Sequence, residues 1–239
     1  MRLGALAAVM TLGACGSGEA PPLTIAAAAN LESALPRLTE AFEQETGIKT
    51  VVSFGATRVL GQQIENGAPF DLFLSADTAE VDRLIGLGRI EKDSRRVYAR
   101  GVLALWSPSG EATSLEDLRG ARFVAMAKPE FAPYGRAARE ALEKAGLWEE
   151  IEPKVVYGQN VRVARQFAES GNADAALIAL SLTEGLPGVV TEVSAASYSP
   201  IEQGAGIVSG GVRIPEALSF GRWLAGSEAR DLLVDSGYR

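Results

Sequence analysis

Residues 64–77 read IENGAPFDLFLSAD, and this stretch alone indicates the fold class. Gly67 ends a helical pattern, because a glycine just past a helix adopts a backbone conformation that other residues avoid. The apolar run at residues 70–75 predicts a buried strand. Asp77, followed three residues later by Glu80, has the spacing of a helix N-cap. Helix, turn, strand and helix start in this order are typical of α/β proteins.

The same alternation of strands and helices extends over the chain on both sides of this stretch. Apolar runs predict strands at residues 23–28, 49–54, 70–75, 97–107, 122–127, 155–156 and 175–180. Helical patterns begin near residues 30, 57, 77, 114, 133 and 160, and two more helices, separated by Gly226, occupy residues 214–236. The helix expected directly after Asn30 contains Pro36, which does not fit a helix interior.

Neither an internal repeat nor a flexible linker divides the mature chain, which has two βα series of similar size. We therefore predict two α/β lobes joined by strands that cross near residues 97–105 and 196–208. Lobe 1 is predicted to contain residues 23–100 and 200–239, and lobe 2 residues 101–199.

The first residues have the pattern of an export signal. Arg2 precedes an apolar run of about ten residues, whereas a helix that spans a bilayer needs roughly 20. The sequence Leu-Gly-Ala-Cys that follows resembles a bacterial lipobox, in which the cysteine is lipidated. We predict a lipoprotein signal peptide at residues 1–14, a lipidated Cys15 and a flexible tether at residues 15–22. The alternative is a plain secretory signal, which leaves a soluble periplasmic protein.

Composition narrows the functional classes. The chain has 239 residues, 47% of them hydrophobic. Loss of Arg2 with the signal peptide leaves 22 basic and 30 acidic residues, a net charge of −8, which argues against nucleic acid as a partner. Because histidine is absent, Ser-His-Asp triads, Cys-His nucleophiles and the usual zinc sites are excluded. No glycine motif for nucleotides is present. We expect no enzyme, no cofactor and no free metal cation; a glycosidase-like carboxylate pair is the remaining enzymatic alternative.

Four strand-to-helix turns carry residues suited to binding an anion: Asn30, Thr57, Tyr134 and Val161, the last preceded by Asn160. The first four backbone N–H groups of a helix have no partner within the helix, and the helix dipole makes that end partly positive. Several helix starts that meet in one cleft bind an anion without a formal positive charge. Capped helices occur in every α/β protein, however, and spacing alone does not show that these four meet.

Several segments of the chain resemble the periplasmic molybdate-binding proteins. They are residues 26–31 (AAAANL), 54–57 (FGAT), 67–77 (GAPFDLFLSAD), 133–135 (PYG), 160–162 (NVR), 176–181 (ALIALS) and 220–238. The resemblance covers essentially the whole mature chain, and residues 64–77 are its most specific part. It implies a type II periplasmic-binding-protein fold, in which two lobes, each a mixed sheet flanked by helices, close on a hinge around an oxyanion in the cleft between them.

The resemblance also implies roles for individual residues. Asn30 and Thr57 become ligands from the first lobe, through their side chains and backbone N–H groups. Tyr134 and Val161 occupy ligand positions in the second lobe, Val161 through its backbone.

Two positions depart from the family pattern. Ala179 stands where some relatives have a tyrosine hydroxyl, so Tyr134 or Ser181 would have to supply that contact. Arg58 stands where relatives usually have a small residue. Its guanidinium either faces solvent or lies at the rim of the cleft, where it adds attraction for anions or relaxes selectivity.

The resemblance therefore implies a monomeric solute-binding protein that captures molybdate, or tungstate of nearly the same size, for the membrane permease of an ABC importer. The lipobox-like sequence adds the expectation of a lipid anchor. A cleft lined only by donors leaves the proton of monohydrogen phosphate unpaired, so it disfavours phosphate. Two alternatives remain open: a receptor for another small anion such as sulfate, and an anion sensor with no role in transport. The export signal argues against the sensor.

Overall fold

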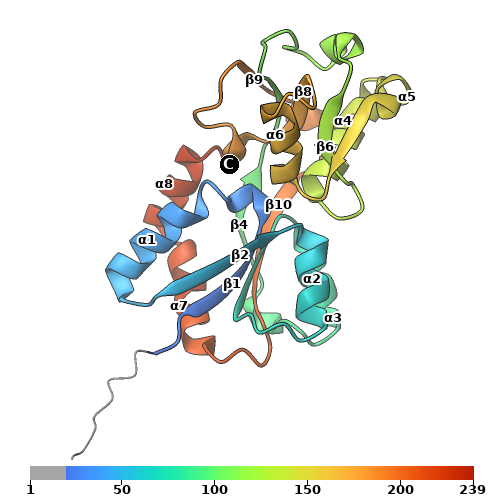
Figure 1. Ribbon diagram of the computed structural model, residues 1–239. Coiled ribbons are helices and arrows are strands. Elements are labelled where there is room, and N and C mark those ends of the chain that lie inside the picture. Colours follow the sequence, from blue (N-terminus) through green and yellow to red (C-terminus); the bar gives the residue numbers. More distant parts are fainter. Residues whose placement is uncertain (1–19) are drawn as a thin grey trace, which may run out of the picture.

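The alternation of strands and helices is present in the computed structural model, which describes residues 20–239 (Figure 1). The signal peptide predicted at residues 1–14, the lipidation site Cys15 and the first part of the tether lie outside the described residues. The strands form two five-stranded sheets, both mixed and both flanked by helices. The predicted α/β architecture is therefore confirmed.

The first sheet has the strand order β2-β1-β3-β10-β4. Its strands are β1 (Leu23–Ala28), β2 (Thr50–Gly55), β3 (Leu72–Ser75), β4 (Arg96–Gly101) and β10 (Ile201–Ile207). β1 runs parallel to β2 and β3, whereas β10 is antiparallel to both β3 and β4. Every residue of the central strand β3 is buried, as expected for a strand that is covered on both faces.

Helices cover both faces of this sheet (Figure 1). They are α1 (Leu35–Thr46), α7 (Ile214–Leu224) and α8 (Ser227–Asp235) on one face, and α2 (Thr57–Glu65) and α3 (Thr78–Gly86) on the other. Ile25 and Ala27 of β1 pack with Phe42 of α1. Ala26, which lies between them in sequence, packs with Leu60 of α2 on the opposite face. Successive side chains of a strand point to opposite faces, so β1 serves both cores.

The second sheet has the strand order β7-β6-β8-β5-β9. Its strands are β5 (Leu103–Ser107), β6 (Val124–Ala127), β7 (Val155–Gly158), β8 (Ala175–Ala179) and β9 (Val189–Glu192), and its helices are α4 (Pro133–Lys144), α5 (Trp148–Ile151) and α6 (Val161–Glu169). Helices α4 and α6 both contact β6 and β8. Short 3-10 helices connect the elements of both sheets: η1 (Ala29–Leu31), η2 (Lys92–Ser94), η3 (Glu116–Gly120), η4 (Glu152–Lys154), η5 (Leu180–Leu182) and η6 (Ala195–Ser197).

The chain passes between the two sheets twice. β4 ends at Gly101 and β5 begins at Leu103, so the single strand predicted at residues 97–107 is wrong: it is two strands in different sheets. The second passage is the segment between β9 and β10. We call the part built on the first sheet lobe 1 and the part built on the second sheet lobe 2. The exact lobe boundaries stay a prediction.

One helix begins later than predicted. Residues 29–31 form the short helix η1, and α1 begins only at Leu35, so Asn30 does not start an α-helix. Pro36 explains the difference, because proline in the first helical turn lacks only an N–H that would be unpaired anyway. Asp77 does cap α3, since its Oδ1 accepts a hydrogen bond from the backbone N of Glu80 at 3.0 Å.

Candidate anion-binding site

A narrow cavity lies between the two lobes, and in this structure it has room for about one water molecule. Its lining consists of Ala28, Ala29, Asn30, Gly55, Ala56, Thr57 and Ala76 from lobe 1 and Ala132, Pro133, Tyr134, Asn160 and Val161 from lobe 2. Asn30, Thr57, Tyr134 and Val161, which were predicted from the sequence, are all part of this lining. The fold therefore brings the four residues together, and their role as ligands stays a prediction.

A larger and more open hollow lies on lobe 2, between the segment before η3, helix α4 and the segment after β9. Only residues of lobe 2 line it, so a movement of the lobes would not enclose a ligand there. The smaller cavity is shared by both lobes and lies beyond the carboxyl ends of parallel strands, where open α/β sheets bind ligands. We therefore take the smaller cavity as the candidate site.

Tight turns fix where the helices of lobe 2 begin. Gly135 lets α4 pack onto the end of β6, because a Cβ at this position would collide with the carbonyl group of Ala127. Gly158 ends β7, and a Cβ there would lie 2.6 Å from the backbone nitrogen of Ala164 in α6. Only glycine permits these approaches, so the two glycines determine how closely the helix starts reach the cavity.

The helix starts present backbone N–H groups at the cavity. The N-cap residues of α2 and α4 are Ala56 and Ala132, which have no polar side chain to cap the helix. The N–H groups of Thr57, Tyr134 and Val161 precede the first hydrogen bond within their helices, and no backbone hydrogen bond elsewhere among residues 20–239 uses them. The partly positive ends of three helices therefore meet here, an arrangement that suits an anion.

Thr57 adds a hydroxyl group to these donors. Its Oγ1 accepts a hydrogen bond from the backbone N of Ala76 at 3.2 Å, so the hydroxyl hydrogen is available to a ligand. Asn160 is used differently, because its Oδ1 accepts from the backbone N of Val163 at 3.0 Å and so caps α6. Lobe 2 thus offers backbone groups, and lobe 1 offers a side-chain donor as well.

Asn30 is buried and held by residues that are distant in sequence. Its Nδ2 donates to Gln203 Oε1 at 2.8 Å and to the Tyr238 hydroxyl oxygen at 2.7 Å. The backbone carbonyl oxygen of Asn30 accepts from Ser181 Oγ at 2.8 Å and from the Tyr238 hydroxyl at 2.9 Å. Gln203 is held in turn, since its Nε2 donates to the carbonyl of Ile201 at 3.2 Å. Both amide hydrogens of Asn30 are engaged, so the side-chain donation predicted for it requires the amide to turn when an anion enters.

Tyr134 and Ser181 were the residues expected to replace the tyrosine hydroxyl that some relatives have at the position of Ala179. Ala179 and Ser181 are outside the cavity lining, and the hydroxyl of Ser181 donates to the carbonyl of Asn30. Tyr134 lines the cavity, but its hydroxyl lies against Gly101, where a Cβ would collide with it. Burial raises the pKa of Tyr134, so its phenol is neutral at physiological pH. The Tyr134 hydroxyl thus lies at the passage between the lobes.

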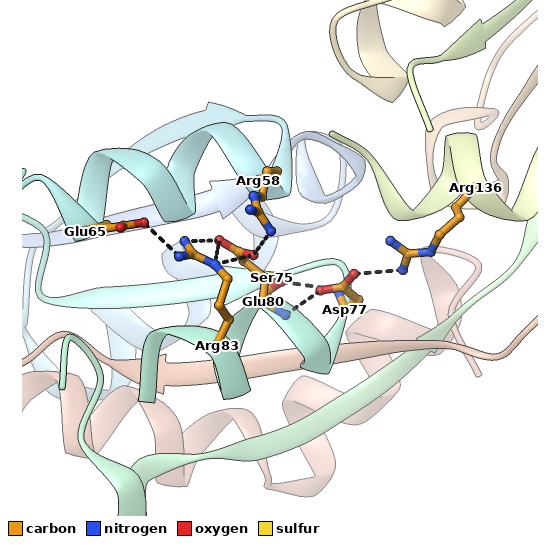
Figure 2. Close-up of polar contacts among 7 residues, drawn as sticks. All are labelled: Arg58, Glu65, Ser75, Asp77, Glu80, Arg83 and Arg136. Carbon is orange, nitrogen blue, oxygen red and sulfur yellow. Dashed lines mark hydrogen bonds and ion pairs between the residues drawn. The ribbon is translucent and has the colours of Figure 1, made fainter. Parts of the chain in front are cut away.

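Arg58 lies beside the cavity but does not line it. Figure 2 shows its guanidinium directed toward Glu80, with Nη1 at 3.4 Å from Oε2. Arg83 binds the same carboxylate and also pairs with Glu65. The charge of Arg58 is therefore balanced within lobe 1, although its side chain is 45% exposed at the rim. Its effect on selectivity stays a prediction.

Comparisons with known proteins agree with this geometry. Residues 23–239 match the model of a family described as bacterial extracellular solute-binding protein. The molybdate-binding protein ModA of Azotobacter vinelandii is 35% identical over 243 residues, which cover 94% of this chain and 92% of the relative. ModA of Rhodobacter capsulatus is 33% identical over a region that covers 100% of this chain and 96% of that protein.

Solved structures show the same fold. The periplasmic molybdate-binding protein of Azotobacter vinelandii matches with a TM-score of 0.86 at 31% sequence identity, covering 91% of this chain and 98% of its own. The sulfate-binding protein SubI of Mycobacterium tuberculosis has a TM-score of 0.78 at 19% identity and covers 91% and 86%, which shows a shared fold alone. The predicted periplasmic-binding-protein fold is confirmed. The chain belongs to the bacterial extracellular solute-binding proteins, in the group that contains the molybdate-binding ModA proteins.

Proposed function

We propose that this protein is the extracytoplasmic binding protein of an ABC importer and that it captures molybdate. The observation that carries the proposal is the meeting of Asn30, Thr57, Tyr134 and Val161 around one cavity shared by two lobes. The two full-length relatives at 35% and 33% identity are molybdate-binding proteins by name. Helix starts and a hydroxyl suit the same ligand chemistry, a small tetrahedral oxyanion.

Neutral donors are sufficient to hold such an anion. Removing a dianion from water costs several kcal/mol per charge even after the protein relaxes. Each hydrogen bond to a charged group contributes about 1.5–3 kcal/mol, and each helix start roughly 0.3–2 kcal/mol. Three first-turn N–H groups and the Thr57 hydroxyl offset much of this cost, and the engagement of Asn30 adds to them. Micromolar binding requires a net free energy of about 8 kcal/mol.

A lining dominated by donors favours oxyanions that carry no proton. Molybdate, tungstate and sulfate are unprotonated dianions at neutral pH, whereas monohydrogen phosphate brings a proton that needs an acceptor. Tungstate is nearly the same size as molybdate, so a cleft that opens wide enough for one takes the other as well. Sulfate is smaller, and its oxygens reach the donors over longer and weaker hydrogen bonds. Cavity size therefore separates sulfate from the two metal oxyanions.

Transport follows from closure of the lobes around the anion. We propose that residues 23–100 with 200–239, and residues 101–199, move as two units about the passages between the sheets. An anion that bridges both units favours the closed form, which docks on the membrane permease. The protein acts by binding, without catalysis, as a monomer. The lipobox-like sequence supports removal of residues 1–14 and anchoring through lipidated Cys15.

Calorimetric titration of the purified protein with molybdate, tungstate, sulfate and phosphate tests the proposal. Molybdate and tungstate should bind with micromolar or lower Kd, and sulfate about tenfold or more weakly. Thr57→Val removes the hydroxyl donor and should weaken molybdate binding about 10- to 100-fold. Thr191→Val in β9, outside the cavity, is the matched control and should bind as the unchanged protein does. Tighter binding of sulfate would favour the sulfate receptor, and binding of no oxyanion would overturn the proposal.

A further inference from the structure

Two arginines of lobe 2 lie within two residues of the residues that form its half of the cavity. Arg136 comes two residues after Tyr134 at the start of α4, and Arg162 comes directly after Val161 at the start of α6. Their side chains are 51% and 39% exposed. Neither arginine lines the cavity itself. They are therefore neighbours of the anion site and not contacts within it.

Each of these arginines is paired with a carboxylate of lobe 1. Arg136 Nη2 lies 2.8 Å from Asp77 Oδ2, and Arg162 Nη1 lies 3.0 Å from Glu32 Oε1. Figure 2 shows the first pair, with Arg136 reaching from α4 toward the start of α3. Both carboxylates are less exposed than their arginines, at 14% and 29%. Asp77 is fixed further as the N-cap of α3. The two ion pairs bridge the lobes.

The pairs exist only while the lobes are together, because the partners belong to different lobes. When the lobes separate, lobe 2 presents two unpaired guanidinium groups beside two helix starts, and lobe 1 presents two unpaired carboxylates. The other charges at this rim of lobe 1 remain balanced, since Arg58 and Arg83 pair with Glu80 and Glu65 in the same lobe (Figure 2). At the positions of these two pairs, the two faces of the open cleft therefore carry opposite charges.

We infer that Arg136 and Arg162 are capture residues. The oxyanion binds first to lobe 2, and the two arginines then form ion pairs with Asp77 and Glu32 when lobe 1 closes over it. This inference rests on the proposed function of the cavity. In the open protein the arginines raise the local concentration of a dianion at the helix starts, even though the net charge of the chain is −7. In the closed protein the same arginines are neutralised and hold the lobes together over the anion.

Paired charge variants distinguish capture from a purely structural role. Arg136→Gln combined with Arg162→Gln removes the capture charges. Arg119→Gln combined with Arg139→Gln is the matched control, because these arginines also lie in lobe 2, have exposures of 51% and 46%, and pair with carboxylates of the same lobe. Calorimetry gives the Kd of molybdate, and a chase of radioactive molybdate with unlabelled molybdate gives its dissociation rate. The dissociation rate constant divided by Kd gives the association rate constant. Both measurements are repeated at several ionic strengths.

At low ionic strength, the Arg136→Gln/Arg162→Gln protein should associate with molybdate at least about threefold more slowly than the control, and the difference should shrink as salt screens the charges. Asp77→Asn combined with Glu32→Gln removes the repelling charges of lobe 1, and an asparagine at the first of these positions preserves the helix cap. This protein should associate about twofold or more faster than the unchanged protein, and it should release molybdate about two- to tenfold faster because both ion pairs are lost.

Equal association rates for the capture and control variants at low salt would overturn the inference. Slower association of the carboxylate variant would overturn it too, because lobe 1 would then not repel the incoming anion. Thermal melting of each variant, followed by circular dichroism, confirms that the proteins compared are folded. If the unchanged protein does not bind molybdate, the proposed function fails and this inference fails with it.

Discussion

Replacement of Gly135 by alanine is a severe perturbation of the candidate site by a single methyl group. A Cβ at this position would lie 2.8 Å from the carbonyl carbon of Ala127 and 3.0 Å from that of Lys128. Carbon atoms in contact prefer separations of about 3.5–4.0 Å, so the start of α4 must retreat from the end of β6 by roughly 1 Å. Both obstacles are backbone atoms, which cannot rotate away as a flexible side chain would.

The displacement acts on Tyr134, the neighbour of Gly135 in the first turn of α4. A hydrogen bond of about 2.9 Å from the Tyr134 N–H to the anion would be stretched beyond about 3.5 Å, where it is lost. Loss of one hydrogen bond to a charged ligand costs about 1.5–3 kcal/mol, which weakens binding about 10- to 100-fold. The fold loses less, because overpacking costs about 1–3 kcal/mol and alanine gains about 1 kcal/mol over glycine within a helix.

Calorimetric titration with molybdate and urea denaturation of the same variant separate the effect on binding from the effect on stability. Gly221→Ala in α7 is the matched control, since Gly221 is also helical and its Cβ would meet open space. The control should keep its Kd for molybdate and gain up to about 1 kcal/mol in free energy of unfolding. A folded Gly135→Ala protein that binds molybdate as tightly as the unchanged protein would refute the role assigned to the Tyr134 N–H.

Three further predictions concern the surroundings of the cavity. Tyr238→Phe removes a hydroxyl that donates to the Asn30 carbonyl and accepts from its amide; we expect a loss of about 1–3 kcal/mol in urea denaturation and weaker molybdate binding, and an unchanged Kd would contradict the link to the cavity. Glu80→Gln removes a carboxylate shared by two arginines; it should lower stability by about 1–3 kcal/mol but leave the Kd for molybdate within about twofold, and a larger change in Kd would place the cluster in the site. Burial raises the pKa of Tyr98, Tyr134 and Tyr238 in the folded protein. The stability that these neutral phenols contribute is therefore complete below a pH of about 10, the pKa of a tyrosine in the unfolded chain, and is lost as the pH rises above that value. An absorbance titration should show the three ionising only with unfolding, and reversible ionisation of any of them in the folded protein would argue against this.

Much of the fold is predictable because its signals are local. The helix starts at Thr57, Tyr134 and Val161 each follow an apolar run and precede a helical stripe, which a short window of sequence reveals. Their meeting depends on which strands pair, and a single sequence does not contain that information. The resemblance to molybdate-binding proteins supplied this step, and the parallel pairs β1–β2 and β6–β7 account for it physically.

Other features have no local signal. Gln203 and Tyr238 bond the side chain of Asn30 from 173 and 208 residues away, and nothing in their own neighbourhoods marks them as partners of a site. Residues 97–107 are apolar apart from Arg100, Gly101 and Ser107, and this short interruption does not reveal that the chain changes sheet at Val102. Strand β9 (VVTE) and helix α5 (WEEI) are absent from the predicted elements, because each has only four residues and neither forms a continuous apolar run as the four-residue strand β6 (VAMA) does.

The central claim is that backbone N–H groups at helix starts of both lobes replace the water around the anion. A crystal structure of the protein with molybdate tests it most directly. We predict oxygen atoms of the anion within about 2.7–3.2 Å of the backbone nitrogens of Thr57, Tyr134 and Val161, with no guanidinium group in contact. A molybdate ion held by arginine side chains, or by one lobe alone in a closed protein, would contradict the claim.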